Sequence, residues 1–340
     1  MVQVRPTPEP QAELYRPEET LEEAAETGAE DAPERRLAEA GAAQQGLRLD
    51  KWLVQLAPEF SRSHLQSLIE RGCVRLDGQV ATQASRKLRL GQRLELELLP
   101  TEETLAFRPE AMALDILFED EHLLVLNKPA GLVVHPAAGN WSGTLMNGLL
   151  AHHAVAATLP RAGIVHRLDK DTSGLMVVGK TLAAVTALVR MIAAREVHRE
   201  YLALAWGRTP EAWVVDAPIA RDPQSRVRMA VVGGGKPART DIYRIGEARH
   251  QERVVSALHC VLHSGRTHQI RVHLSHKGHP LLADMLYGGQ PGLGLQRQAL
   301  HAARLSLVHP LLGQDLRLEA PLPADLGAAW QAAGLPAPRF

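Results

Sequence analysis

The residues best able to do chemistry stand together between His166 and Gly174, in the order His-Arg-Leu-Asp-Lys-Asp-Thr-Ser-Gly. An imidazole, two cations and two carboxylates are concentrated there. A carboxylate beside cations stays ionised, and it can then attack an electrophile or stabilise a neighbouring cation. These residue types leave open a second interpretation, in which the stretch is a solvated charged turn that caps itself.

The segments on either side of this stretch are predicted to position it. Residues 163–165 and 175–178 are apolar and typical of buried strand ends, whereas residues 171–174 are turn formers. Reactive groups are usually presented by loops that a rigid scaffold holds in place. We therefore expect residues 166–174 to form a loop between two strands.

This stretch resembles the signature of the RluA-type pseudouridine synthases, and Arg161-Ala162-Gly163-Ile164-Val165 before it resembles the RluD-type members in particular. Three further segments carry the same resemblance. They are residues 126–136 (Leu-Asn-Lys-Pro-Ala-Gly-Leu-Val-Val-His-Pro), 199–201 (Arg-Glu-Tyr) and 265–273 (Gly-Arg-Thr-His-Gln-Ile-Arg-Val-His). The match extends from about residue 107 to about residue 323.

The resemblance implies an enzyme that isomerises uridine to pseudouridine within RNA, with no cofactor and no metal. It implies that Asp169 is the catalytic carboxylate, that Arg271 holds it ionised and oriented, and that Tyr201 stacks on the base. A uridine in folded RNA must be flipped out, and Arg167 matches the family residue that reaches into the vacated helix. Arg167 could instead form a salt bridge to Asp169 or Asp171.

A histidine-rich segment leaves a zinc-dependent hydrolase open as an alternative. Its candidate ligands are His268, His273, His276, His279 and Asp284. Their spacing matches no recognised ligand pattern. If residues 270–274 form a strand, as their apolar pattern predicts, His268 and His273 point to opposite faces. We therefore predict no metal site and a structural role for His268.

Composition indicates a soluble protein with room for two domains, since the chain has 340 residues and is 45% hydrophobic. No apolar run approaches the roughly 20 residues that cross a bilayer, and the N-terminus lacks the apolar core of a signal peptide. We expect no membrane partner and a cytoplasmic location. The two cysteines, Cys73 and Cys260, each lie in an apolar pattern and are expected to be buried thiols.

The formal net charge of zero hides an asymmetry. Residues 1–45 hold eleven acidic and four basic side chains, which leaves a net charge of +7 on the rest of the chain. That sign suits a polyanionic partner such as RNA. Because the same 45 residues contain few large apolar side chains, we predict a disordered acidic tail, in which a short helix around residues 21–40 could form.

Residues 46–100 are predicted to form a small RNA-binding module. Leu49, Trp52, Leu53 and Leu56 fall on one helical face, and Ser63 and Gln66 have the spacing of a capping box at the start of a second helix. Short strands follow, and the module resembles the alpha-L RNA-binding domain. Its candidate RNA-binding residues are Arg48, Lys51, Arg62, Arg71 and Lys87. An ordinary small domain with solvated basic residues is the alternative.

The remaining segments are interpreted as a linker (101–109), a catalytic domain (110–326) and a C-terminal tail (327–340). Many short apolar segments and few helices predict an α+β domain around a mixed, mostly antiparallel sheet flanked by helices, and the resemblance implies the same.

The resemblance to RluD-type enzymes implies a stem-loop of large-subunit rRNA as the substrate, free or in a precursor particle, and we expect a monomer. Another rRNA site or tRNA is the alternative substrate, because RNA is recognised largely through shape and splayed loops. A non-catalytic ribosome-assembly factor of the same fold is a further alternative. The presence of Asp169, Tyr201 and Arg271 together argues against it.

Overall fold

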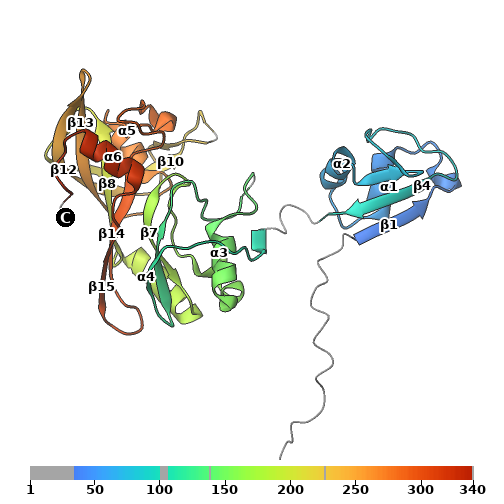
Figure 1. The fold of residues 1–340 in the computed structure, drawn as a ribbon, viewed down its shortest axis with the longest axis horizontal. Coiled ribbons are helices and arrows are strands. Elements are labelled where there is room, and N and C mark those ends of the chain that lie inside the picture. The colour runs from blue at the N-terminus through green and yellow to red at the C-terminus, as the bar shows by residue number, and fades with distance from the viewer. Residues whose placement is uncertain (1–33, 100–105, 138, 226, 339–340) are drawn as a thin grey trace, which may run out of the picture. The chain divides into compact units, whose positions relative to one another are not determined.

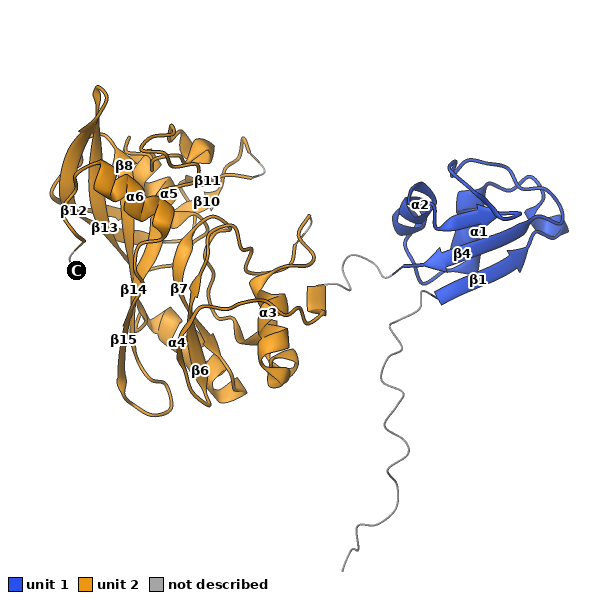
Figure 2. Ribbon diagram, in the orientation of Figure 1, with its two compact units in different colours: residues 1–101 blue, residues 102–340 orange. Residues whose placement is uncertain are grey.

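A computed structural model describes residues 34–99, 106–137, 139–225 and 227–338. The chain divides into two compact units, residues 1–101 and 102–340 (Figures 1 and 2). Each unit has its own hydrophobic core and is described separately.

The N-terminal unit combines two helices, α1 (Leu49–Leu56) and α2 (Arg62–Glu70), with a small antiparallel sheet. The strand order is β1-β4-β2-β3, with β1 (Glu34–Glu39), β2 (Val74–Leu76), β3 (Gln79–Val80) and β4 (Arg93–Leu98). The predicted apolar helix face is confirmed, because Leu49, Trp52 and Leu53 are buried in the core of this unit.

The cap of the second helix differs from the predicted one. The helix begins at Arg62, and its N-cap is Ser61, whose hydroxyl accepts a hydrogen bond from the backbone N–H of His64 at 3.2 Å. Ser63 and Gln66 therefore lie inside the helix and form no capping box. Either serine has the required hydroxyl, so the spacing alone did not separate them.

The folded unit starts earlier than predicted. Residues 34–45 were assigned to the disordered tail on composition, but they form β1 and the 3-10 helix η1 (Ala42–Gln44). β1 pairs with β4 along its whole length, and Arg36 donates a hydrogen bond to the Leu56 carbonyl at 2.8 Å and pairs with Glu59. Backbone pairing and these contacts stabilise a strand whose own residues are mostly polar. The remainder of the predicted tail, residues 1–33, lies outside the described residues.

The C-terminal unit is built on a mixed sheet with nine strands in the described ranges. The strand order is β5-β6-β7-β14-β8-β13-β12-β9, and β15 pairs with β14. The strands are β5 (Ile116–Glu119), β6 (Leu123–Lys128), β7 (Ser173–Gly179), β8 (His198–Trp206), β9 (Ala212–Asp216), β12 (Arg239–His250), β13 (Arg253–Leu262), β14 (Leu300–Val308) and β15 (Asp315–Glu319). β7 and β14 run parallel and the other pairs are antiparallel, which confirms the predicted fold class.

Helices and short elements surround this sheet (Figure 1). They are α3 (Leu145–His152), α4 (Leu182–Ala194), α5 (Gln269–His276) and α6 (Ala324–Ala332), the 3-10 helices η3 (Ala154–Thr158), η4 (Pro160–Gly163) and η5 (Met285–Tyr287), and a ribbon of β10 (Ile219–Arg221) and β11 (Met229–Val231). α4 is capped by Thr181, whose hydroxyl accepts a hydrogen bond from the backbone N–H of Ala184 at 3.2 Å.

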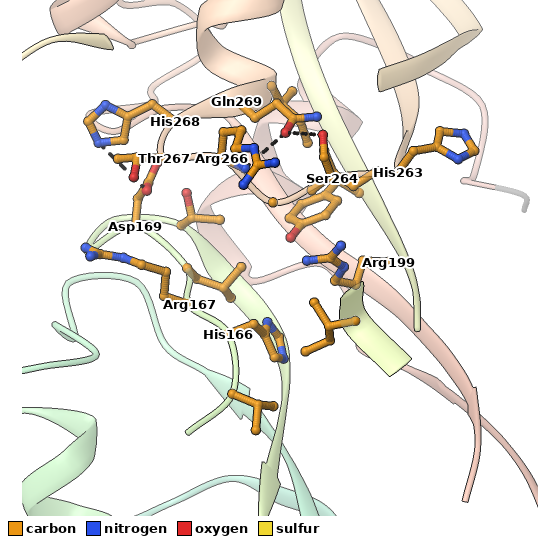
Figure 3. A pocket seen from close by; sticks show the side chains of 18 of the residues that line it. His166, Arg167, Asp169, Arg199, His263, Ser264, Arg266, Thr267, His268 and Gln269 are labelled. Atoms are coloured by element: carbon orange, nitrogen blue, oxygen red, sulfur yellow. Dashed lines mark hydrogen bonds and ion pairs between the residues drawn. The ribbon is translucent and has the colours of Figure 1, made fainter. Parts of the chain in front are cut away.

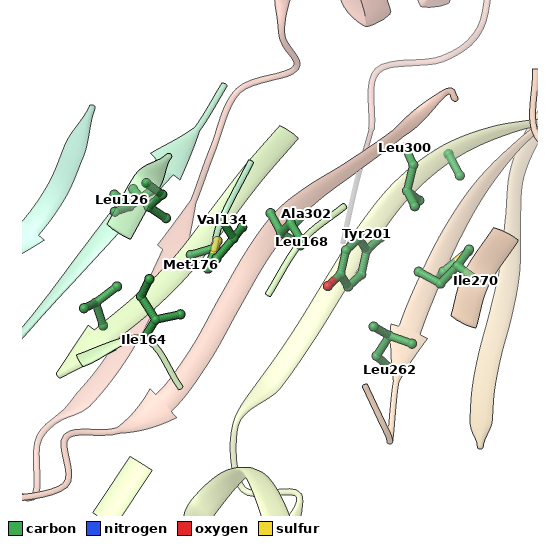
Figure 4. Packing of buried hydrophobic residues seen from close by; sticks show 14 of the residues in the cluster. Leu126, Val134, Ile164, Leu168, Met176, Tyr201, Leu262, Ile270, Leu300 and Ala302 are labelled. Carbon is green, nitrogen blue, oxygen red and sulfur yellow. The ribbon is translucent and has the colours of Figure 1, made fainter. Parts of the chain in front are cut away.

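Alternation along β8 places successive side chains in two different cores. Tyr201 and Ala203 belong to a cluster on one face, with Leu168, Leu262 and Ile270, and Figure 4 shows these side chains around Tyr201. The intervening residues Leu202, Leu204 and Trp206 join a second cluster that includes Leu326 and Trp330 of α6. Both faces of this central strand are therefore covered, and two of its odd-numbered residues, Arg199 and Tyr201, line the pocket described below.

Three predicted assignments in this unit are wrong: the strand over residues 270–274, the linker over residues 101–109 and the C-terminal tail over residues 327–340. Residues 270–274 lie in helix α5 and not in a strand, because Ile270 and Leu274, four residues apart, share a face of a helix as well as of a strand. Part of the predicted linker is packed, since the Asn147 side chain donates to the carbonyls of Ala106 at 3.4 Å and Arg108 at 2.8 Å.

The predicted C-terminal tail is also largely folded. α6 extends to Ala332, and Trp330 and Leu335 are buried. The Trp330 indole N–H donates to the Pro336 carbonyl at 2.8 Å. Residues 327–340 contain few large apolar side chains, so their composition did not predict a packed segment. Burial of Trp330 and Leu335 holds the segment in place. None of the helices in the described ranges is long and apolar enough to cross a membrane.

The β1 pairing predicts different outcomes for two truncations. Removal of residues 1–33 should leave the thermal unfolding of the N-terminal unit unchanged, whereas removal of residues 1–45 deletes β1 and exposes the edge of β4. We expect the longer truncation to lower the unfolding midpoint and weaken RNA binding, measured by calorimetry and filter binding. Equal midpoints for both truncations would contradict this account of β1.

Candidate active site

The loop that carries Asp169 is tied to a neighbouring loop by a buried lysine. Lys128 Nζ donates hydrogen bonds to the carbonyl oxygens of Pro129 at 2.8 Å, Leu132 at 2.9 Å and Lys170 at 2.9 Å. Burial lowers the pKa of Lys128 to about 8, which leaves the ammonium group protonated at neutral pH. The charge at the end of β6 thus fixes the backbone next to Asp169.

The loop is not a solvated turn. Leu168, Thr172 and Ser173 within it are buried. Gly174, at φ 117°, lets the backbone of β14 approach, since a Cβ there would lie 2.2 Å from the Ala302 carbonyl oxygen. This contradicts the alternative of a self-capping charged turn, because the segment is held by the sheet on which it lies.

Arg271 holds the Asp169 carboxylate. The Arg271 side chain, on α5, is buried and donates from Nη1 to Asp169 Oδ2 at 3.0 Å. Its Nε and Nη2 donate to the two carboxylate oxygens of Asp284 at 2.7 and 2.8 Å. Burial opposes the charge on Arg271, but the hydrogen bonds and charges of Asp284 and Asp169 raise its pKa above the ordinary value. The guanidinium is therefore a permanent cation shared by two carboxylates.

Tyr201 lines the same pocket from β8. Its side chain is buried, and that burial is the main cause that raises the pKa of its hydroxyl to about 12. The phenol is therefore neutral at physiological pH, and it can pack against a base or donate a hydrogen bond. The structure thus brings Asp169, Tyr201 and Arg271 together from three separate elements.

The pocket around these residues is a cavity of about 910 Å³ with a strongly cationic lining (Figure 3). Among its lining residues Asp169 is the single carboxylate. Six arginines line it as well: Arg161, Arg167, Arg195, Arg199, Arg266 and Arg271. Such a surface favours a polyanionic ligand and would hold it around the Asp169 carboxylate.

Arg167 is exposed and does not pair with its acidic neighbours. Within the described residues it forms no ion pair with Asp169 or Asp171, so the predicted alternative of a local salt bridge is contradicted. Figure 3 shows its guanidinium extending away from Asp169. An exposed, unpaired guanidinium at the rim of the pocket is free to contact a ligand.

His268 lies in the pocket, where the sequence had predicted a purely structural role. Its Nε2 is 3.8 Å from Asp169 Oδ1, and its Nδ1 is 2.7 Å from the Tyr287 hydroxyl. That hydroxyl also accepts the Met229 N–H at 2.9 Å, so its own proton is free to bond His268 Nδ1. Burial is the main cause that lowers the pKa of His268. A neutral ring with its proton on Nε2 then faces the reactive carboxylate.

The zinc alternative is not supported by the positions of its candidate ligands. His273 is engaged by the Thr240 hydroxyl at 2.9 Å and the Ala217 carbonyl at 3.0 Å. His268 and Asp284 are bound to Tyr287 and Arg271. Within the part of the chain that the structure describes, no three histidine, cysteine or acidic side chains converge as metal ligands do.

The basic residues of the N-terminal unit differ in how they are held. Arg48 and Arg62 both bond the carboxylate of Asp50, which is fully buried, at 3.0 and 2.6 Å. These hydrogen bonds, that of Arg48 being the largest cause, lower the pKa of Asp50. Three other candidates, Lys51, Arg71 and Lys87, are exposed. The unit thus presents two oriented guanidinium groups and three further exposed cations.

Two features of the site escaped prediction. Asp284 was considered only as a zinc ligand, because no local pattern connects it with Arg271. Arg199 stood in a motif beside Tyr201 without an assigned role, although a spacing of two along a strand predicts that both side chains share a face. The two-residue alternation of a strand could therefore have predicted that Arg199 lies beside Tyr201.

Comparisons with known proteins match both units of the chain. Residues 122–276 match the model of the RNA pseudouridylate synthase family, and residues 47–94 match the S4 domain model. The human protein named RNA Pseudouridylate Synthase Domain Containing 1 has a similar solved structure, with a TM-score of 0.51 and 26% identity over 68% of this chain and 90% of that one.

The chain belongs to the RNA pseudouridylate synthase family, and the predicted resemblance is confirmed. Among its relatives is Ribosomal large subunit pseudouridine synthase D of Nitrosomonas europaea, 51% identical over 84% of each chain. A protein of the same name from Neisseria meningitidis serogroup B is 49% identical over 83% of this chain and 77% of that one.

The shared guanidinium predicts that Asp284 is needed for activity. Asp284→Asn removes one of two carboxylates that orient Arg271, and small misplacements of catalytic groups cost about 100-fold in rate. We expect kcat for pseudouridine formation to fall by about that factor, with RNA affinity largely retained. Glu247→Gln is the matched control, because it disrupts an equally bidentate pair with Arg208 outside the pocket. Equal, small losses in both variants would show that Asp284 does not position the site.

Proposed function

We propose that this protein converts uridine to pseudouridine in large-subunit rRNA, with Asp169 as the catalytic carboxylate. One observation carries the proposal: a single carboxylate, held by Arg271 at 3.0 Å, lies in a cavity that six arginines also line. The basic lining suits RNA phosphates, and the carboxylate suits the reaction. The names of the two bacterial relatives support large-subunit rRNA as the substrate.

The reaction is an isomerisation in which atoms balance without a co-reactant. The bond between N1 of uracil and C1′ of ribose breaks, and a bond between C5 and C1′ forms. The proton lost from C5 is balanced by a proton gained at N1. Asp169 supports the first step, since an anion can attack covalently or stabilise the developing sugar cation before leaving again.

The partners of Asp169 have separate roles in this proposal. Arg271 donates a hydrogen bond to the carboxylate and fixes its direction. Tyr201, buried and neutral, provides a flat surface for the detached base and a hydroxyl for proton transfer. His268 presents a donor 3.8 Å from Asp169, where it can bond either the carboxylate or the uracil.

Access to the target requires the uridine to leave its stack, which costs a few kcal/mol. Arg167, exposed at the rim of the pocket, is placed to occupy the vacated position, where a planar guanidinium can stack and donate hydrogen bonds. The S4 domain adds affinity through its basic residues, including Lys51, Arg71 and Lys87. One chain supplies the lining of the cavity, and we propose that a monomer acts on RNA in the cytoplasm.

The direct test is incubation of the purified protein with large-subunit rRNA transcripts labelled at uracil C5, followed by tritium release and mass-spectrometric mapping. We expect stoichiometric release at discrete uridines. Release only from tRNA would replace the rRNA assignment. RNA binding without release from either RNA would instead support a non-catalytic assembly factor.

The exposed position of Arg167 predicts a substrate-dependent defect. Arg167→Ala should lower kcat/KM on a stem-loop by about 10- to 100-fold, because flipping loses its support. The loss should be smaller on an unstructured oligonucleotide that contains the same uridine. Parallel kinetics on the two RNAs measure this difference. An equal loss on both would place Arg167 in the chemistry or in general binding.

A further inference from the structure

A buried arginine in the wall of the pocket has no anionic partner in the protein. Arg199 lies on β8, is 6% exposed and lines the cavity with Tyr201. Its side chain forms no hydrogen bond and no ion pair with any residue that the structure describes, and its Nε is buried without a partner. Burying an unpaired charge is costly, so an anion from outside the chain would relieve the site.

The carboxylates nearest to Arg199 are engaged elsewhere. Glu200, the next residue, points to the opposite face of β8 and lies 2.7 Å from His259 and 3.5 Å from Arg304. Asp169, the carboxylate of the pocket, is held by Arg271. The protein therefore leaves the charge of Arg199 uncompensated.

A second unpaired donor lies on the same wall. His166 Nε2 accepts a hydrogen bond from the Val177 N–H at 3.0 Å, which places the proton of the neutral ring on Nδ1. Nδ1 is buried and has no partner. Burial, followed by the nearby charge of Arg199, lowers the pKa of His166 to about 3, so the ring is neutral. Figure 3 shows both side chains on one side of the cavity.

The loop after β13 makes room for the guanidinium. A Cβ at Gly265 would lie 2.8 Å from Arg199 Nη1, so the guanidinium rests against the backbone of this glycine. Arg266 of the same loop also lines the cavity. The surroundings of Arg199 thus supply donors and cations but no acceptor of opposite charge.

We propose that Arg199, assisted by His166, binds a phosphodiester group of the nucleotide that reacts at Asp169. This inference rests on the proposed function, which makes RNA the ligand. Arg199 and Tyr201 share a face of β8 about 6.6 Å apart, so a nucleotide with its base on Tyr201 brings a phosphate within reach of the guanidinium. Phosphate oxygens match the fork of an arginine and neutralise its charge, which a uracil carbonyl does not.

The first test compares the stability of Arg199→Met with that of the wild type, using inorganic phosphate as the probe. Replacing an unpaired buried charge with an apolar side chain should leave the unfolding temperature of the free protein unchanged or higher. Phosphate should raise the unfolding temperature of the wild type and have a smaller effect on Arg199→Met. Arg190→Met is the matched control, since Arg190 is exposed on α4 and outside the pocket lining.

The second test measures RNA binding by filter retention at several salt concentrations. Arg199→Met should weaken binding of the substrate stem-loop by on the order of 10- to 100-fold, as expected for a charged hydrogen bond. The slope of log affinity against log salt should fall by about one. Arg190→Met should match the wild type in both quantities.

The proposal is overturned if phosphate stabilises Arg199→Met and the wild type equally, or if the salt slope of RNA binding is unchanged. A lower unfolding temperature of Arg199→Met with an unaltered phosphate response would assign Arg199 to the scaffold. Neither measurement depends on turnover. A failure of the wild type to form pseudouridine would thus refute the proposed function without deciding the role of Arg199.

Discussion

The site depends on one guanidinium that two carboxylates share. Arg271 is buried, and alone its charge would be costly. Asp284 neutralises it through two hydrogen bonds, and the third, to Asp169, leaves the group of three with one net negative charge. Of the two carboxylates, Asp169 is the one that lines the pocket, so the net negative charge faces the pocket there. A carboxylate held in this way is fixed in direction before any RNA binds.

This interaction requires most of the C-terminal unit to be folded. Asp169 and Arg271 are 102 residues apart in sequence, and they meet because α5 and the loop before β7 lie at the same pocket. The parallel pairing of β7 with β14 holds the end of the loop. The hydrogen bond from Lys128 Nζ to the Lys170 carbonyl holds its middle. Contacts of such long range form only with the sheet itself, so the catalytic geometry is a property of the whole unit.

The arginines of the pocket divide into two groups with different energetic roles. Arg271 is fully paired and contributes to the folded state, whereas Arg167 and Arg199 have no carboxylate partner among the described residues. We propose that RNA phosphates supply the counter-charge that the protein does not provide for these two arginines.

The sequence predicted the parts of the structure that follow local patterns. The strand after the Asp169 loop and the mostly antiparallel sheet were predictable, because periodicity and turn residues encode them. The strand end predicted at residues 163–165 is wrong, because Gly163 ends the 3-10 helix η4 and Ile164 forms only an isolated bridge to Val178. β1 was not predictable, since a polar edge strand is stabilised by its partner β4 and not by its own composition.

Among the site residues too, those in local motifs were predicted and those that depend on tertiary contacts were not. Asp169, Tyr201 and Arg271 were found through motifs, and the structure places them in one pocket. The partner of Arg271 was missed, because the pairing with Asp284 arises only when α5 and the segment after it fold back on each other. Burial was equally invisible in the sequence, and it is burial that distinguishes the unpaired Arg199 from a solvated arginine.

The central claim, that the Asp169 carboxylate performs the chemistry, is tested most directly by Asp169→Asn. The amide keeps the shape of the side chain but carries no negative charge, so single-turnover pseudouridine formation should fall by at least about 1,000-fold while RNA binding persists. Asp171→Asn, in the same loop but outside the pocket lining, should remain active. Pseudouridine formation by Asp169→Asn at a substantial fraction of the wild-type rate would contradict the account.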